Sequence, residues 1–268
     1  MTKMRTEHDS LGEMQLPADA LYGVHTQRAL DNFPITGVGL SHFPELVRAL
    51  AMVKKAAAMA NRDLGELDPA IAATIIEVCD EIIAGQHHDS FVVDMVQGGA
   101  GTSTNMNTNE VIANLGLAKM GYAYADFAHL HPNDHVNRSQ STNDVYPTAI
   151  RLAALAKCVD LAAEQRRLRD AFAIKAREFG HVMKVGRTQL QDAVPITLGS
   201  EFASFATTVN EDIDRLEQLS ALLMEVNLGG TAVGTGINSP DGYAALSVEN
   251  LAAVSGYPLV GASDLIEA

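Results

Sequence analysis

Residues 198–223 read LGSEFASFATTVNEDIDRLEQLSALL, and apolar side chains recur along this segment at alternating steps of four and three residues. The positions are Leu198, Phe202, Phe205, Val209, Asp212, Leu216, Leu219 and Leu223, of which only Asp212 is polar. This spacing places one apolar stripe on a single helix face, as in bundles of long helices. The segment therefore predicts a long helix that packs against at least one other helix.

A second long helix is predicted earlier in the chain, from about Asp144 to Phe179. Its first half, residues 149–163, is apolar nearly all round, which predicts a helix buried among others, whereas its second half is charged. The polar segment GRTQLQDAVP, residues 186–195, separates the two long helices.

The residues nearer the N-terminus predict shorter elements. Residues 1–40 are rich in Gly, Pro and Asp, and we expect them to be irregular, with two short strands near Gly12–Leu16 and Leu21–Val24. Two helices follow, with Pro44 and Pro69 in their first turns and Asp68 as an N-cap. Their side chains with helical spacing are Leu46, Val47, Leu50, Val53 and Lys54 in the first helix and Ile71, Ile75, Val78 and Ile82 in the second.

Polar loops connect the remaining helices. Residues 97–109 read QGGAGTSTNMNTN and precede a helix expected from Glu110 to Met120. Residues 129–147 read HLHPNDHVNRSQSTNDVYP and lead into the first long helix. A Gly-rich loop at 228–238 precedes a last helix that opens at Pro240-Asp241.

These patterns predict a mainly α fold with a small mixed N-terminal domain at 1–141 and part of a helical-bundle domain at 142–268. The residues before Ala268 are still helical and apolar in pattern. Two or three long helices do not bury their own apolar faces. We therefore expect the missing cover to come from more chain, from other subunits, or from both.

Composition limits the function. The net charge of −14 disfavours binding to a nucleic-acid backbone. Cys79 and Cys158 lie among apolar residues, which predicts two buried free thiols and a reducing compartment. Residues 1–10 have no apolar core of a secretory signal, and no apolar run approaches the ~20 residues of a membrane span. We expect a cytoplasmic protein that binds neither membrane nor nucleic acid.

Motifs for common cofactors are incomplete. Gly99-Ala100-Gly101 resembles the start of a dinucleotide fingerprint, but Thr104 stands where its third glycine belongs, and no phosphate loop with Lys is present. His129, His131 and His135 do not match a zinc spacing. We expect neither a metal nor a cofactor.

Two dense Ser/Thr/Asn clusters, at 101–105 and 139–144, precede helical patterns. Ordinary N-capping explains one such residue per helix, at ~1 kcal/mol each. Two clusters exceed that need. Hydroxyls, amides and free backbone N–H groups at positive helix ends favour carboxylate binding instead, which lets an acidic protein hold an anionic substrate.

At these residues the chain resembles the aspartase/fumarase superfamily, and within it the aspartase family. The resemblance covers essentially the whole chain and is carried by PADALYGVHTQR at 17–28, GGAGTSTNMNTNE at 98–110, HPNDHVNRSQSTND at 131–144 and GRTQLQDAVP at 186–195. It implies elimination of ammonia from L-aspartate to give fumarate in a homotetramer with shared active sites.

The resemblance also implies residue roles. Thr102, Ser141 and Thr142 match catalytic residues that hold the carboxylate beside the carbon that loses its proton. That carboxylate becomes an aci-carboxylate, an enediolate with an extra negative charge. Donors aimed at this charge stabilise the transition state more than the substrate.

Four further positions match substrate-binding residues. Asn143 matches the contact to the leaving amino group and Thr188 the contact to the other carboxylate, while Ser103 is a neighbour. Gln189 stands where the fumarases and some aspartases have His. An amide does not exchange protons, so we expect Gln189 to position the substrate.

Three functions remain open at this point. Fumarases of this type carry S-S-N-D-T-F-P and G-R-T-H, whereas this chain has STNDVYP at 141–147 and GRTQ at 186–189, which favours an aspartase over a fumarase-like hydratase. A non-catalytic helical-bundle paralogue is the third alternative. The intact set of polar site residues argues against it.

The superfamily's third region, a mobile loop of the form G-S-S-x-x-M-P-x-K-x-N, supplies the general base, and no such segment occurs within residues 1–268. We therefore expect a fragment of a longer protein or a truncated gene product. Alone, we expect this chain to be inactive and poorly soluble.

Overall fold

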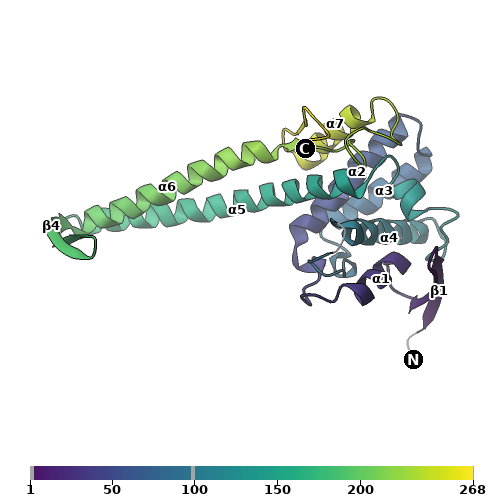
Figure 1. Cartoon of the computed structure of the whole chain (residues 1–268), viewed down its shortest axis with the longest axis horizontal. Coiled ribbons are helices and arrows are strands. Elements are labelled where there is room, and N and C mark those ends of the chain that lie inside the picture. Colours follow the sequence, from purple (N-terminus) through teal and green to yellow (C-terminus); the bar gives the residue numbers. More distant parts are fainter. Residues whose placement is uncertain (1–2, 98–99, 268) are drawn as a thin grey trace. The chain divides into compact units, whose positions relative to one another are not determined.

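A computed structural model describes residues 3–97 and 100–267, and it confirms a mainly helical fold with three small two-stranded sheets (Figure 1). The chain divides into two compact units. The first comprises Met1–Ala153 and Met224–Ala268, and the second comprises Ala154–Leu223. The domain division expected at 141/142 stays a prediction.

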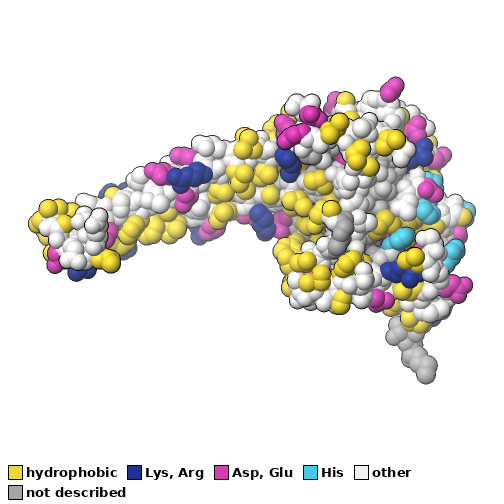
Figure 2. Space-filling model, in the orientation of Figure 1, with side chains coloured by type: hydrophobic (Ala, Val, Ile, Leu, Met, Phe, Trp, Pro, Cys, Tyr) yellow, Lys and Arg dark blue, Asp and Glu magenta, His cyan; other side chains and the backbone are white. Residues whose placement is uncertain are grey.

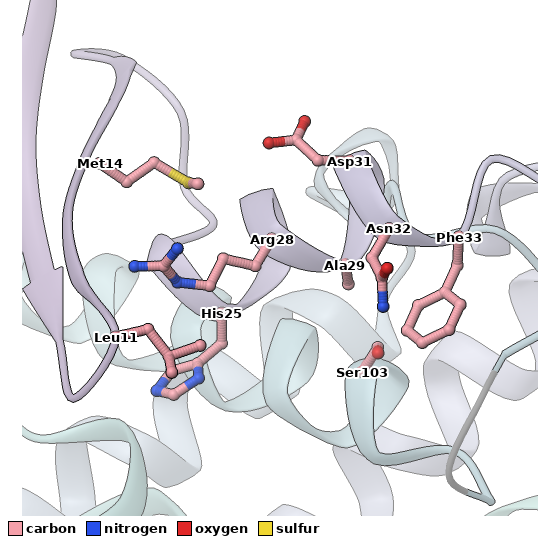
Figure 3. A pocket seen from close by; sticks show the side chains of 9 residues that line it. All are labelled: Leu11, Met14, His25, Arg28, Ala29, Asp31, Asn32, Phe33 and Ser103. Carbon is pink, nitrogen blue, oxygen red and sulfur yellow. The ribbon is translucent and has the colours of Figure 1, made fainter.

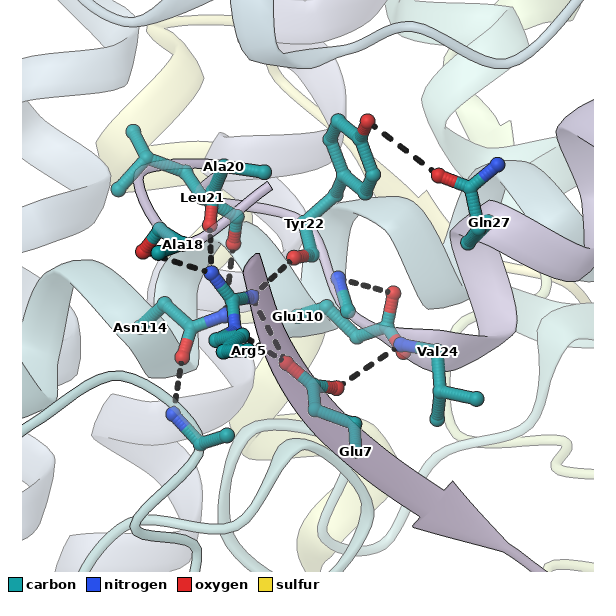
Figure 4. Close-up of polar contacts among 12 residues, drawn as sticks. Arg5, Glu7, Ala18, Ala20, Leu21, Tyr22, Val24, Gln27, Glu110 and Asn114 are labelled. Carbon is teal, nitrogen blue, oxygen red and sulfur yellow. Dashed lines mark hydrogen bonds and ion pairs between the residues drawn. The ribbon is translucent and has the colours of Figure 1, made fainter. Parts of the chain in front are cut away.

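The first unit begins with an antiparallel hairpin of β1 (Met4–Asp9) and β2 (Gly12–Pro17), followed by α1 (Val24–Asn32). The strand expected near Gly12–Leu16 is therefore confirmed. The strand expected at Leu21–Val24 is wrong, because Val24 begins a helix. The cause is tertiary: the buried Glu110 carboxylate accepts hydrogen bonds from the backbone N–H groups of Gly23, His25 and Thr26, which caps α1. Figure 4 shows Glu110 beside Glu7, whose carboxylate accepts from the Val24 N–H at the same helix start.

Three helices form the centre of this unit: α2 (Pro44–Asp63), α3 (Pro69–Ile83) and α4 (Thr102–Lys119). The predicted starts of α2 and α3 are confirmed. Pro44 and Pro69 occupy first-turn positions, and the Asp68 carboxylate accepts from the N–H groups of Ala70 and Ile71. Short 3-10 turns lie at Leu40–His42 and His88–Ser90.

Helix α4 begins eight residues before the expected start at Glu110, so the polar segment 102–109 is helix and not loop. Its amides explain why. Asn107 bonds the Ser90 carbonyl and the Val92 N–H, and Asn114 bonds the Leu21 carbonyl and the Ala125 N–H. Polar side chains therefore replace apolar ones inside this unit, because they tie neighbouring loops to a buried helix.

The remaining elements of the first unit surround the start of α5 (Thr142–Glu178). A π-helical turn spans Pro132–Val136, and β5 (Glu225–Val226) pairs in parallel with β6 (Val260–Gly261). The expected last helix is confirmed as α7 (Tyr243–Ser255). The fully buried Tyr243 side chain packs with Ala57 and Ala60 of α2.

The second unit consists of α5 from Ala154 onward, a hairpin of β3 (Met183–Thr188) and β4 (Gln191–Thr197), and α6 (Leu198–Leu223). The predicted seam is confirmed where Phe202 and Phe205 of α6 contact Phe172 of α5 with ring centroids 6.1 and 5.6 Å apart. Arg166 of α5 also pairs with Glu217 of α6 at 2.6 Å.

The described residues bury only part of the first half of α5, including Ala149, Leu152 and Leu155. Val159 and Leu161 are 59% and 50% exposed. Apolar side chains lie at the surface of the helical pair as well as of the first unit (Figure 2). The apolar pattern therefore reports faces that the described residues leave uncovered.

None of the helices in the described parts of the chain is both long enough and apolar enough to cross a membrane.

Asp94 fastens two loops of the first unit, and it predicts a loss of stability in acid. Burial opposes its ionisation, but N–H donors of Val96, Thr36 and Gly37 outweigh that effect and lower the pKa of Asp94 to about 2. The stability this carboxylate contributes is present above its ordinary pKa of 3.8 and is lost as the pH falls through about 2. The free energy of unfolding of Asp94→Asn should therefore be lower than that of the wild type at neutral pH. It should also fall less as the pH is lowered.

The measurement is denaturant unfolding from neutral to acid pH, with the exposed Asp19→Asn as control. A variant Asp94→Asn as stable as Asp19→Asn at neutral pH would contradict the assignment.

Candidate functional site

The N-termini of α4 and α5 lie against each other in the first unit. The Asn105 side-chain amide donates to Thr142 Oγ1 at 3.2 Å. Gly101, at φ +91°, leaves no space for a side chain, since a Cβ there would lie 2.3 Å from the Tyr146 ring. Two positive helix ends thus meet at one place, which is the arrangement that attracts an anion.

The turn that begins α5 is held by its own polar groups. The Ser141 N–H donates to Asp144 Oδ1 at 2.9 Å, and the Asn143 N–H donates to Ser141 Oγ at 3.2 Å. The other Asp144 oxygen accepts from the N–H groups of Gly229 and Thr231 at 3.1 and 3.0 Å. Asp144 therefore joins the α5 N-terminus to the Gly-rich loop.

Five of the seven residues expected at the site lie at these two helix ends. They are Thr102, Ser103, Ser141, Thr142 and Asn143. Thr102 and Asn143 are exposed, while Ser103, Ser141 and Thr142 are half-buried. The Asn143 amide donates to the Ala232 carbonyl at 2.7 Å. The structure therefore brings the two clusters of polar residues together, and their roles stay predictions.

The other two residues belong to the second unit. Thr188 ends β3, and Gln189 and Leu190 form the two-residue turn to β4. Both turn residues have left-handed backbone, at φ 48° and 64°, without being glycine. Thr188 and Gln189 are exposed, and Leu190 is 95% exposed. The expected polar loop is thus a hairpin tip that presents these side chains to solvent.

A cavity of about 480 Å³ adjoins Ser103 in the first unit (Figure 3). Its polar lining includes His25, Arg28 and Asn32 of α1. The Arg28 guanidinium forms two hydrogen bonds of 2.8 Å with the Asp9 carboxylate. The Arg28 charge is therefore largely balanced by Asp9, so the helix ends are the better anion site.

Beneath the α5 turn lies a charged residue whose importance the sequence did not indicate. Lys54 of α2 is fully buried, and its ammonium donates to Asn137 Oδ1 and Gln140 Oε1 at 2.8 and 2.9 Å. Burial lowers the pKa of Lys54 to about 7, and the charge of Asp144 opposes that effect. In the sequence, the one indication that Lys54 is buried is its position on the apolar helix face that holds Val47 and Leu50.

The three histidines that lack a zinc spacing differ in burial, since His131 and His135 are half-buried. His129 is exposed and stacks on Tyr122 with ring centroids 3.7 Å apart. Among residues 3–97 and 100–267, no three His, Cys, Asp or Glu side chains are placed to hold a metal ion. Two glycines of the polar segment 97–109, Gly98 and Gly99, lie outside the described residues.

Comparisons with known proteins find relatives over nearly the whole chain. A family model described as "Lyase" matches residues 12–268. Aspartate ammonia-lyases from Pseudomonas canavaninivorans and Escherichia coli are 59% and 52% identical over 98% and 99% of this chain. The chain spans 56% of the length of each of these relatives.

Two solved structures share the fold. A fumarate lyase:delta crystallin from Brucella melitensis, bound to cobalt, has a TM-score of 0.97 and 54% identity and covers 99% of this chain and 58% of its own. A class II fumarase from Schistosoma mansoni has a TM-score of 0.88 and 34% identity and covers 95% and 53%. The resemblance to the aspartase/fumarase superfamily is thereby confirmed, and this chain belongs to the lyase family.

Proposed function

We propose that this chain forms part of an aspartate ammonia-lyase, a cytoplasmic carbon–nitrogen lyase that converts L-aspartate into fumarate and ammonia. The observation that carries the proposal is the meeting of two hydroxyl-rich helix N-termini, at Thr102 and Ser141, in an acidic protein. The identity to aspartate ammonia-lyases supports the choice of substrate.

The chemistry explains why such a site suits this reaction. A base removes a proton from the carbon beside one carboxylate, and the electron pair moves into that carboxylate to give the aci-carboxylate. The pair then returns to form the carbon–carbon double bond, and the carbon–nitrogen bond breaks to release ammonia. Backbone N–H groups and hydroxyls at the helix ends stabilise the second negative charge, which exists only after the proton has left.

The other contacts come from Asn143 at the start of α5 and from the hairpin tip. We assign Asn143 to the leaving amino group, and Thr188 and Gln189 to the second carboxylate and its surroundings. The resemblance assigns the base to the superfamily's third region, which does not occur in residues 1–268. It also assigns each site to several subunits of a homotetramer. The exposure of Thr188 and Gln189 at a hairpin tip supports a role in a neighbour's site.

A substrate comparison tests the proposal. The full-length protein, the complete product of the gene, is incubated with L-aspartate or with L-malate, and fumarate is followed by its ultraviolet absorbance. We expect fumarate from L-aspartate, with release of one ammonia for each fumarate. Fumarate from L-malate alone would identify a hydratase, and turnover of neither substrate would favour a non-catalytic paralogue.

A further inference from the structure

We propose that Lys54 is a positioning residue that holds the Ser141–Asn143 turn and supplies a buried positive charge beneath the carboxylate site. This inference rests on the proposed function and adds a residue that none of the quoted active-site segments contains.

Two side chains on one face of helix α2 form hydrogen bonds with the segment before α5. Lys54 holds Asn137 and Gln140, and Asn61 donates to the Arg138 carbonyl at 2.9 Å and accepts from Ser139 Oγ at 2.7 Å. Lys54 and Asn61 are seven residues apart, which places them on the same helix face two turns apart. Ser139 has left-handed backbone at φ 61°, so the segment is bent at the point where Asn61 holds it.

A chain of hydrogen bonds continues from Lys54 to the site. Asn137 Oδ1 accepts from Lys54 and also from the Asn105 amide at 3.1 Å. The same Asn105 amide donates to Thr142 Oγ1. Lys54 is thus two side chains away from a hydroxyl assigned to the substrate carboxylate. The path runs through the half-buried Asn137 and the buried Asn105, where polar interactions are stronger than in water.

The balance of charges explains why a cation is placed here. The titratable groups that act on the Lys54 ammonium are Asp144 of α5 and the Cys79 thiol of α3. Burial raises the pKa of Cys79 above its ordinary range, so the thiol stays neutral. Tyr243, which packs on α2 from α7, also stays neutral because burial raises its pKa. Without Lys54, the buried Asp144 carboxylate would leave negative charge beside an anion site.

The protonation of Lys54 should depend on whether an anion is bound at the site. The pKa of Lys54 is about 7, so the free protein loses this positive charge as the pH rises through neutrality. A bound dianion favours the ammonium. Anion affinity that depends on Lys54 should therefore fall on the alkaline side of about pH 7.

The test uses the full-length protein and succinate, an unreactive dicarboxylate whose carboxyl groups are both ionised at neutral pH. The variants are Lys54→Met and, as matched control, Lys55→Met, whose ammonium pairs with Asp80 at the surface. Succinate affinity is measured by calorimetry across neutral and alkaline pH, together with kcat and KM for L-aspartate and the thermal midpoint. We expect Lys54→Met to bind succinate ~10-fold or more weakly at neutral pH and to lose the alkaline decline.

Identical succinate affinities of Lys54→Met and Lys55→Met at every pH would overturn the inference. If Lys54→Met does not fold, Gln140→Leu removes one acceptor of the ammonium and should weaken succinate binding to a smaller extent. Equal binding by Gln140→Leu and Lys55→Met would then overturn it. Succinate binding needs no turnover, so the two proposals can fail separately. If Lys54→Met weakens succinate binding but the wild-type protein does not convert L-aspartate, only the proposed function is refuted.

Discussion

Ser141→Ala in the full-length protein is expected to lower kcat for L-aspartate by ~10²-fold, as loss of one oxyanion donor does. Ser141 Oγ lies at the N-terminus of α5 and accepts from the Asn143 N–H. Its hydroxyl hydrogen is therefore available for the carboxylate that gains charge. The measurement is steady-state formation of fumarate, with kcat and KM determined separately.

The matched control separates catalysis from helix capping. Asp68→Ala removes the side chain that caps α3, which accepts from Ala70 and Ile71. Both substitutions remove a cap worth ~1 kcal/mol of stability. Only Ser141→Ala should reduce kcat. Equal kinetic losses in the two variants would mean that Ser141 is only a cap.

Glu110→Ala is expected to destabilise the protein by about 3 kcal/mol or more. The carboxylate is 1% exposed and accepts from three backbone N–H groups and from the Thr26 hydroxyl at 2.6 Å. The substitution leaves those donors at the start of α1 buried without a partner. Denaturant unfolding followed by circular dichroism measures the loss.

Glu77→Ala is the control for this prediction. Glu77 pairs with Lys119 at 2.7 Å, but its side chain is 65% exposed. Exposed ion pairs contribute at most ~1 kcal/mol. A loss of stability in Glu110→Ala no larger than in Glu77→Ala would show that the N-terminus of α1 does not depend on the carboxylate.

Local sequence signals predicted the helices that depend on local chemistry. Pro44 and the Asp68-Pro69 pair mark helix starts whose first turns satisfy their own N–H groups, and the alternation from Phe202 to Leu219 needs only helical geometry. The predictions for Leu21–Val24 and for the start of α4 were wrong because these segments depend on contacts with residues distant in sequence. Helix α1 depends on Glu110, which is 87 residues from Gly23 in sequence.

The hairpin that carries Thr188 was not predictable because its turn lacks the usual sequence signal. Its turn has two left-handed residues, Gln189 and Leu190, in place of the Asn-Gly or Asp-Gly pairs that announce such turns. The residues at the site were found through the resemblance and through their density of hydroxyls. Lys54 was not found, because a buried lysine is recognisable only when its acceptors, Asn137 and Gln140, are seen beside it.

The most direct test of the account is a crystal structure of the full-length protein with succinate bound. We predict that one succinate carboxylate lies at the paired N-termini of α4 and α5, within hydrogen-bond distance of the Ser141 and Thr142 hydroxyls. Succinate bound in the cavity beside His25 and Arg28, with those helix ends empty, would contradict the account.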